Sequence, residues 1–357
     1  MTRADTAIRA DDVREQAAAV GFDLCGIATA DAFPELQHLR EWLDRGYAGE
    51  MQYMHRSADR RADVRHVLPS ARSVIALGTI YNTDRPYSTE RRDHTRAEIA
   101  RYAWGDDYHT VIRDRLDRLL AWLREAAGPS FEGRAYVDTG PVQERVYAQH
   151  AGIGWIGKNT CVINPALGSW LFLSEIICNL PLVPDAPALD RCGTCTLCLD
   201  ACPTGAFVEP YTLDSTRCIS YLTIELKGPI PSVQREDIGA HAYGCDVCQE
   251  VCPWNHRPAI VSDSAWLPRS GLDTPQLLEL WQHTDDELRG LMKGSAMTRA
   301  GVKRLRRNVA VAIGNSGDVQ AAATLESHQA PSCADPLVAD HIRWAIRKLR
   351  SGYSEEE

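Results

Sequence analysis

The pattern of apolar and polar positions predicts two kinds of structure along the chain. In the first half, short apolar runs such as residues 73–79 (SVIALGT) are rich in β-branched residues and predict buried strands. Residues 110–127 carry apolar side chains at helical spacing and predict an amphipathic helix. Such alternation predicts an N-terminal domain of the α/β or α+β class over residues 1–185.

The C-terminal part of the chain is expected to be helical. Beyond the proline-rich connector at 181–187, apolar residues return at helical spacing in 274–291, 302–313 and 336–349, and 314–317 (GNSG) predicts a break between helices. Paired helices of this kind are similar to a short HEAT-like unit, although no second copy of similar sequence is found. The predicted domains are therefore 1–185, 186–260 and 261–357.

Composition indicates a globular protein, because 44% of the residues are hydrophobic and 24% are charged. The longest apolar stretch, 170–183, is interrupted by Ser174, Glu175 and Asn179 well before the ~20 residues that a membrane span requires. The beginning of the chain, MTRADTAIRADD, has no apolar core behind a basic region, and so it does not look like a secretory signal. We therefore expect no membrane association and a cytoplasmic location.

The twelve cysteines point to metal binding, because cytoplasmic thiols stay reduced. Cys192, Cys195, Cys198 and Cys202, followed by Pro203, form the C-x2-C-x2-C-x3-C-P run of bacterial iron–sulfur proteins. The alternative is a structural zinc site, which prefers two CxxC pairs separated by a longer loop and has no use for the third close cysteine. The spacing favours a [4Fe–4S] cluster.

A second run, Cys245, Cys248 and Cys252, lacks the first cysteine of the pattern, and Cys218 is the candidate to replace it. Exchange of the fourth ligands assigns one [4Fe–4S] cluster to Cys192, Cys195, Cys198 and Cys252, here called the first cysteine group. The second cysteine group is Cys202, Cys218, Cys245 and Cys248. The four remaining cysteines are expected to be core residues: Cys25, Cys161, Cys178 and Cys333.

Basic side chains gather in two of the predicted helices although the net charge of the chain is −9. Such runs are often solvated helix faces, but two of them in one domain also suit a phosphate-binding surface. We favour the second interpretation and expect binding to RNA phosphates. The residues concerned are Arg299, Lys303, Arg304, Arg306 and Arg307, followed by Arg343, Arg347, Lys348 and Arg350.

Four stretches, taken together with the cysteines, resemble the epoxyqueuosine reductase family. They are 101–109 (RYAWGDDYH), 136–145 (YVDTGPVQER), 154–170 (GWIGKNTCVINPALGSW) and 218–228 (CISYLTIELKG). The resemblance implies an N-terminal cobalamin-binding domain similar to reductive dehalogenases, a ferredoxin-like module with two [4Fe–4S] clusters, and a HEAT-like helical domain. It also implies reduction of epoxyqueuosine to queuosine in tRNA, the last step of queuosine synthesis.

The same resemblance implies roles for individual residues. Asp138 would be the proton donor, since a carboxyl group beside an apolar corrin has a raised pKa, although an Asp before Thr139 and Gly140 also suits a turn or a helix N-cap. Tyr102 is a second polar candidate near the substrate. The implied cobalamin contacts are Arg61, Asp138, Lys158, Asn159, Val162, Ser220 and Asp246.

The implied cofactor is base-off cobalamin, cycling between cob(II)alamin and cob(I)alamin, with no protein ligand on cobalt. The D-x-H-x-x-G signature is absent, because the stretch beginning Asp107, Tyr108, His109 has Ile112 where glycine would be needed. Expected partners are the anticodon stem-loop of tRNA and a low-potential electron donor such as flavodoxin or ferredoxin, and we expect a monomer. One alternative is a corrinoid reductase acting on a small molecule. The other is an electron-transfer subunit, and this alternative would give the N-terminal 185 residues no function.

Overall fold

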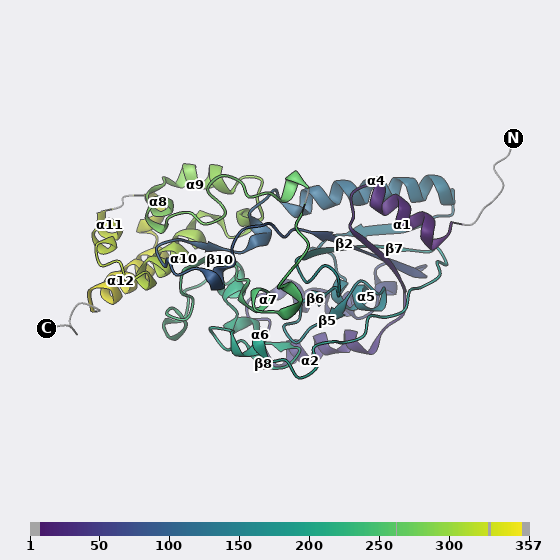
Figure 1. Cartoon of the computed structure of the whole chain (residues 1–357), viewed down its shortest axis with the longest axis horizontal. Helices are drawn as coiled ribbons and strands as arrows, with labels where there is room; N and C mark the ends of the chain where they lie inside the picture. Colours follow the sequence, from purple (N-terminus) through teal and green to yellow (C-terminus); the bar gives the residue numbers. More distant parts are fainter. Residues whose placement is uncertain (1–7, 262, 328–329, 352–357) are drawn as a thin grey trace.

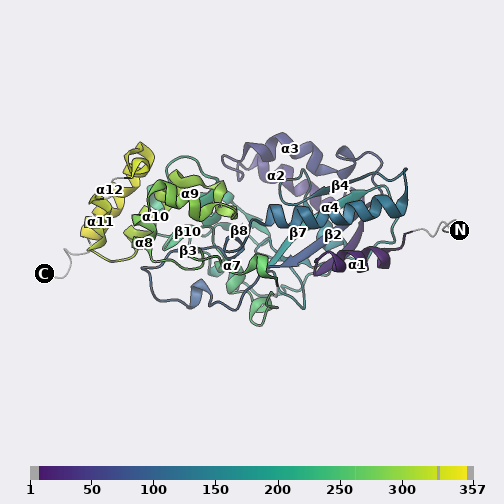
Figure 2. The same cartoon turned by 90° about the horizontal axis from the view of Figure 1, so that it is seen from above.

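The computed structural model describes residues 8–261, 263–327 and 330–351. Figures 1 and 2 show an elongated molecule with a sheet and its helices at one end and a group of helices at the other. Among the described residues, no helix is long and apolar enough to cross a membrane. The first seven residues, on which the expectation about a secretory signal partly rests, lie outside the described part.

The N-terminal region is built on a four-stranded sheet in the order β1 (Leu24–Thr29), β2 (Ser73–Ile80), β7 (Leu171–Cys178) and β4 (Gly133–Tyr136). The strand predicted at 73–79 is confirmed, and all eight residues of β2 are buried. Each pair of neighbouring strands is antiparallel. Within the two classes that the sequence left open, this arrangement is α+β.

Helices cover both faces of this sheet. The helices α1 (Ala10–Ala19) and α4 (Tyr108–Ala127) pack on one face, and α5 (Glu144–His150) packs on the other. Successive side chains of a strand point to opposite faces, so that Ile75 joins the core beneath α4 while Val74 joins the core beneath α5. The helix predicted at 110–127 is confirmed by α4.

Short elements surround this core and lead to the cysteines. The cysteine segment has little regular structure. Its short helices α6 and α7 each begin two residues after a cysteine, Cys195 and Cys245 respectively. The remaining short elements are α2 (His38–Asp44), α3 (Gln52–Ala62), β3 (Glu98–Ile99), β5 (Trp155–Ile156), β6 (Val162–Ile163), α6 (Leu197–Asp200), β8 (Phe207–Glu209), β9 (Thr212–Leu213), β10 (His241–Tyr243) and α7 (Val247–Glu250).

The C-terminal region is helical, as predicted. The predicted helix at 274–291 is two helices, because Thr284 caps the second one and forms a reciprocal capping box with Glu287. Packing of α10 against α12 explains Gly314, since a Cβ atom there would lie 2.8 Å from the Cα atom of Ala345. The helices are α8 (Leu277–Gln282), α9 (Asp285–Met292), α10 (Gly301–Asn315), α11 (Ala321–Ser327) and α12 (Pro336–Ser351).

One hydrophobic core crosses the predicted domain boundaries. Ile99 and Trp104 pack in the same core as Leu280 and Met297 of the C-terminal region. The strands β3 and β10 pair in parallel and connect the N-terminal region to the segment after Cys218. The boundaries at 185 and 260 stay predictions, and so does the likeness of the C-terminal helices to HEAT units.

Candidate active site

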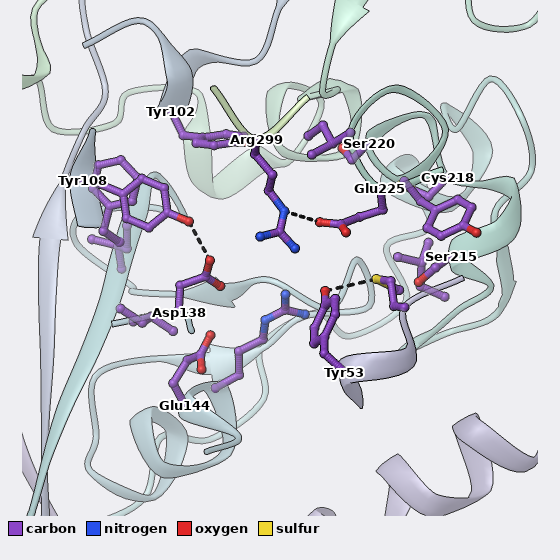
Figure 3. Close-up of a pocket in the computed structure, with 18 of the residues that line it drawn as sticks. Tyr53, Tyr102, Tyr108, Asp138, Glu144, Ser215, Cys218, Ser220, Glu225 and Arg299 are labelled. Carbon is purple, nitrogen blue, oxygen red and sulfur yellow. Dashed lines mark hydrogen bonds and ion pairs between the residues drawn. The ribbon is translucent and has the colours of Figure 1, made fainter. Parts of the chain in front are cut away.

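A cavity of about 430 Å³ opens where the end of the sheet meets the cysteine segment and the C-terminal helices (Figure 3). Its apolar wall includes Leu171, Phe172 and Leu173 of β7, which come from the strand core. Polar side chains from distant parts of the chain also converge on the cavity. They are Tyr53, Tyr102, Tyr108, Asp138, Glu144, Ser220, Glu225 and Arg299.

The backbone at Asp138 is in an uncommon conformation. Its φ is 54°, in the left-handed region that most residues other than glycine avoid and that aspartate tolerates. The amide of Thr139 donates to the carbonyl oxygen of Val137 at 2.5 Å, which closes a tight three-residue turn directly after β4. Residues held in such conformations cluster at functional sites, and here the turn places the carboxylate in the cavity.

Asp138 belongs to a chain of hydrogen bonds that begins at the first turn of α4. Its Oδ2 accepts from the hydroxyl of Tyr108 at 2.8 Å and lies 3.1 Å from Nε2 of His109. The other ring nitrogen of His109 lies 2.8 Å from Oδ1 of Asp107, and Asp107 also caps the helix by accepting from the amide of His109 at 3.0 Å. The imidazole is therefore held between two carboxylates.

These contacts determine whether His109 or Asp138 carries the proton that they share. Burial opposes protonation of His109, but the hydrogen bonds to Asp107 and Asp138 outweigh it and raise the pKa of His109 to about 9. Burial alone would raise the pKa of Asp138, but hydrogen bonds from His109 and Tyr108 outweigh burial and lower it. The sequence argument for a raised pKa of Asp138 is wrong in this structure, because the imidazolium carries the proton near neutral pH.

Replacing His109 by glutamine is expected to raise the pKa of Asp138 above its ordinary value, because the cation is lost and burial then dominates. An NMR titration of the Asp138 carboxyl carbon measures the shift. The matched control is His150→Gln, since His150 pairs with Glu35 and does not line the cavity. An Asp138 titration that stays the same in His109→Gln would contradict this electrostatic coupling.

The sequence analysis did not place two further residues, Glu144 and Arg299, at the cavity. Glu144 begins α5, and burial together with the charge of Asp138 raises its pKa to about 7. Arg299, expected on an RNA surface, lines the cavity and forms an ion pair with Glu225 at 2.6 Å. His109 and Glu144 both lie in the stretches quoted above, but spacing along the chain does not show that they converge.

The thiols of the first cysteine group lie close together. Burial raises the pKa of Cys252 to about 11, and the thiols of Cys198 and Cys192 add to this effect. Burial likewise raises the pKa of Cys198 to about 11, with Cys192 and Cys195 adding. Cys252 thus lies near the first run, and its role as the fourth ligand of that cluster stays a prediction.

The second cysteine group is assembled in the same way. Burial raises the pKa of Cys218 to about 11, and the thiols of Cys245 and Cys202 add to the effect. Contact with Cys161 and burial raise the pKa of Cys248, with Cys245 and Cys218 adding. The assignment of these two groups to two [4Fe–4S] clusters, in which each of the four irons takes one thiolate, stays a prediction.

The four remaining cysteines do not all behave as expected. Cys178 is fully buried in the sheet core, and Cys25 packs against the same core, as predicted. Cys333 packs against the C-terminal core. Cys161 is the exception, because its thiol contacts Cys248, and this hydrogen bond lowers the pKa of Cys161. Cys161 was expected to be a core residue, whereas in this structure it is of intermediate exposure and contacts Cys248.

Two of the predicted cofactor contacts hold the cysteine loops. The ammonium group of Lys158 donates to the carbonyl oxygens of Gly193 at 2.7 Å and Cys195 at 2.9 Å. The side-chain amide of Asn159 is buried and donates to the carbonyl oxygen of Cys248 at 3.0 Å. Through these hydrogen bonds, residues 158–159 are connected to both cysteine runs. Neither residue is among those that line the cavity.

The other predicted cofactor contacts divide between the cavity and its surroundings. Ser220 and Asp138 line the cavity, as does Tyr102. Arg61 donates to the carbonyl oxygen of Val142 at 2.7 Å, which supports the loop between β4 and α5. The remaining two residues are buried away from the lining: Val162 in the core beneath α5, and Asp246, which accepts from the amide of Arg101 at 2.6 Å.

The predicted phosphate-binding surface is wrong for Arg306 and Arg307. Their exposed fractions are 1% and 0%, and each guanidinium donates to backbone carbonyls. Arg307 donates to the carbonyl oxygens of Leu222 at 2.5 Å, Leu226 at 2.8 Å and Gly228 at 2.7 Å. Side chains so engaged are not available to RNA, because they satisfy the polar groups of the segment after Cys218.

The other basic residues of α10, and Arg299 just before this helix, differ in exposure. Arg304 donates to the carbonyl oxygens of Ala300 and Ile224, both at 2.6 Å, and is half-buried. Lys303 has a side-chain exposure of 53% and pairs with Asp335 at 3.1 Å. Of the five predicted RNA contacts, Lys303 and Arg299 keep side chains open to a partner.

Two family profiles match the chain. A profile described as "Epoxyqueuosine reductase QueG, DUF1730" matches residues 61–139, and one described as "4Fe-4S double cluster binding domain" matches residues 191–255. Epoxyqueuosine reductase from Xanthomonas campestris pv. campestris is 40% identical over 351 residues, covering 97% of this chain and 98% of the relative. The enzyme of the same name from Escherichia coli K12 is 38% identical over 339 residues, covering 94% of this chain and 88% of the relative.

Solved structures agree with these matches. A crystal structure of epoxyqueuosine reductase with a tRNA-Tyr epoxyqueuosine-modified stem loop is similar with a TM-score of 0.85 at 34% identity, over 95% of this chain and 89% of that one. The Bacillus subtilis epoxyqueuosine reductase, described with an aspartate catalytic loop swung out of the active site, has a TM-score of 0.83 at 33% identity, over 95% of this chain and 90% of that one.

Proposed function

This chain belongs to the epoxyqueuosine reductase family, and we propose that it reduces the epoxide of epoxyqueuosine to the alkene of queuosine in the anticodon loop of tRNA. Such a reduction removes the ring oxygen as water and consumes two electrons and two protons. The observation that carries the proposal is that a possible source of protons and a possible source of electrons meet at one cavity. Asp138, hydrogen-bonded to a protonated His109, faces the space that Cys218 of the second cysteine group also lines.

The geometry supports Asp138 as the group that delivers a proton. Its carboxylate is the link between the imidazolium of His109 and the interior of the cavity, so that a proton from Nε2 passes through Oδ2 to an acceptor there. Tyr108 donates to the same oxygen and orients it. Tyr102 lines the same space and its hydroxyl lies 3.4 Å from that of Tyr243, which supports a role in shaping the substrate site.

We further propose that cobalamin occupies this cavity. The apolar wall of β7 suits a corrin, and Asp138 and Ser220 offer polar contacts to its amides. Both ring nitrogens of His109 are engaged by carboxylates, which leaves none for cobalt and supports binding without a protein ligand on the metal. When bound, the cofactor supplies the low-potential metal chemistry of the reduction. Arg61, Lys158, Asn159, Val162 and Asp246 are proposed to support this site from the surrounding loops.

The electron route is proposed to run from the first cysteine group to the second. The loop of the first group lies at the surface, where Leu189 and Leu197 are 79% and 48% exposed, and this apolar face suits a docking donor such as flavodoxin or ferredoxin. Cys218 of the second group lines the cavity. We propose that the protein works as a monomer in the cytoplasm, where its thiols stay reduced.

For the RNA, we propose that the modified base enters the cavity beside Arg299, with Lys303 on α10 contributing a phosphate contact. Arg299 is close enough to Asp138 for their charges to interact, which places a cation next to the reacting group. Lys303 lies four residues further along the chain, in the first turn of α10. The C-terminal helices, proposed to be HEAT-like, would hold the stem-loop.

The test is conversion of the nucleoside itself. Anaerobically reconstituted protein is supplied with cobalamin, a chemical reductant and tRNA that carries epoxyqueuosine, and the digested nucleosides are analysed by mass. We expect epoxyqueuosine to lose one oxygen and become queuosine, and no conversion in a control without cobalamin. Cobalamin binding without conversion would favour a corrinoid reductase for a small molecule, and absence of cobalamin binding would favour an electron-transfer subunit.

A further inference from the structure

One short loop joins the two cysteine runs to the cavity. It comprises residues 157–161 between β5 and β6, and is here called the connecting loop. It closes on itself, because the amide of Thr160 donates to the carbonyl oxygen of Gly157 and the amide of Gly157 donates to that of Cys161, both at 2.8 Å. Arg145, which lines the cavity, donates to the carbonyl oxygen of Thr160 at 3.1 Å. A loop tied in this way holds its side chains in fixed positions.

Lys158 of the connecting loop places a positive charge on the loop of the first cysteine group. Its ammonium donates to the carbonyl oxygens of Gly193 at 2.7 Å and Cys195 at 2.9 Å. Both carbonyls belong to the C-x2-C turn that starts at Cys192 and presents two of the predicted cluster ligands. The side chain is half-buried, so solvent and salt screen its charge less than they screen that of an exposed lysine.

The second cysteine group is held by a neutral donor of the same loop. The side-chain amide of Asn159 carries no charge and donates to the carbonyl oxygen of Cys248 at 3.0 Å. Its oxygen accepts from the amide of Cys161 at 3.2 Å, which orients the side chain. The reduction potential of an iron–sulfur cluster depends on the charge around it, so we expect the connecting loop to affect the two clusters differently.

Asp190 is an opposing charge beside the first cysteine group. Its Oδ1 accepts from the amide of Cys192 at 2.8 Å, and its Oδ2 accepts from the hydroxyl of Tyr211 at 2.5 Å. It lies near enough to Lys158 for their charges to interact. Asp190 is exposed and Lys158 is half-buried. Because water screens an exposed carboxylate more strongly, we expect the ammonium to outweigh it.

We propose that Lys158 favours the one-electron reduction of the first cluster, and so makes this cluster the point where electrons enter and are held. The inference rests on the proposed function, through the assignment of a [4Fe–4S] cluster to the first cysteine group. In this step a low-potential donor gives up one electron and the oxidised [4Fe–4S]²⁺ cluster becomes [4Fe–4S]⁺, while no bond breaks and no proton moves. The ammonium attracts the added negative charge, which raises the reduction potential of that cluster.

The test is a redox titration, followed by EPR, of anaerobically reconstituted protein without cobalamin or tRNA. Wild type should show two one-electron steps, one for each cluster. Lys158→Gln keeps an N–H donor for the loop carbonyls but loses the charge. We expect it to move one step to lower potential by about tenfold in the reduction equilibrium, which is about 59 mV for one electron, and to leave the other step in place. Lys158→Arg keeps the charge and should stay within about twofold of wild type.

Two further variants separate the charge from other effects of substitution. Asp190→Asn keeps an oxygen acceptor for the amide of Cys192 but loses the negative charge. It should therefore move the same step in the opposite direction, by about twofold to threefold. The matched control is Lys293→Gln, which changes an exposed lysine directly after α9 and should move neither step. All variants should keep the iron content of wild type, about eight irons per chain.

The inference is overturned if neither step moves in Lys158→Gln, or if both steps move together, which would show a general loosening of the connecting loop. It is also overturned if Lys158→Arg shifts the step as far as Lys158→Gln does. If Lys158→Gln loses iron, Asp190→Asn decides, since the absence of any shift in that variant would overturn the inference.

Failure of the proposed function is recognised separately, because the titration needs neither tRNA nor cobalamin. A wild-type protein that shows both steps and the shifts described, but converts no epoxyqueuosine, would contradict the proposed function and support the role of Lys158. A wild-type protein that holds a single cluster would overturn the assignment of the first cysteine group and this inference together.

Discussion

Replacing Asp138 by asparagine is expected to lower the single-turnover rate of epoxide reduction by about 10²- to 10⁴-fold, the range that general acids contribute. Asparagine has the same shape and also tolerates the left-handed backbone at φ 54°, so the turn after β4 should persist. Its amide still accepts from Tyr108 but cannot pass on the proton of His109. Mass analysis of the nucleosides measures the loss of conversion.

The control for this variant is Asp114→Asn, which changes an aspartate on α4 whose side chain is 72% exposed. Both variants should keep wild-type iron content, cobalamin affinity and tRNA affinity, so that the loss in Asp138→Asn is confined to the chemical step. A rate for Asp138→Asn within tenfold of wild type would remove Asp138 from the role of proton donor. Glu144 would then be the remaining carboxyl group that lines the cavity near this position.

The presence of two iron–sulfur clusters could be predicted from the sequence because iron–sulfur chemistry dictates the spacing of its ligands. The C-x2-C-x2-C-x3-C-P run predicts that its last cysteine belongs to the other cluster. In the structure Cys202 and Cys245 are near enough to Cys218 to affect its pKa, and the ligand exchange itself stays a prediction. Elimination identified Cys218, since it was the one other cysteine in that part of the sequence. The strand at 73–79 and the helix at 110–127 were predicted for a similar reason, because burial on one or both faces leaves a periodic pattern.

The direction of the pKa shift at Asp138 could not be predicted in this way. An argument from an apolar cofactor considers only desolvation, which raises the pKa of a carboxyl group. The opposing contribution comes from His109, 29 residues earlier in the chain, which the N-cap at Asp107 orients toward the cavity. Such an effect depends on the meeting of α4 with the turn after β4, and no pattern within either segment encodes it.

The prediction that Arg306 and Arg307 contact phosphate was wrong for a related reason. Five positive charges in nine residues read as a solvated or phosphate-binding face, because isolated helices keep charges in water. The segment that follows Cys218 packs against this helix and presents the backbone carbonyls of Leu222, Leu226 and Gly228 to Arg307. Arg307 satisfies them, so what looked like a surface for RNA is an internal support of the cavity wall that carries Ser220.

Replacing Arg307 by alanine is therefore expected to lower the free energy of unfolding by about 3–5 kcal/mol, since three buried carbonyls lose a charged donor. The loss should appear as a lower midpoint in denaturant, measured on protein with both clusters in place. Because Leu222 and Leu226 flank the residues that line the cavity, cobalamin affinity should fall with it. RNA affinity should decrease only in proportion to the fraction of protein that is unfolded.

Lys303→Ala is the matched control on the same helix, and it should change the free energy of unfolding by no more than about 0.5 kcal/mol because the side chain is exposed. It should instead weaken tRNA binding and reduce the dependence of that binding on salt, the result expected when one phosphate contact is lost. If Arg307→Ala were as stable as wild type while binding tRNA more weakly, the guanidinium would be meeting RNA and its internal role would be wrong. The two variants together separate the support of the cavity wall from the surface that meets the nucleic acid.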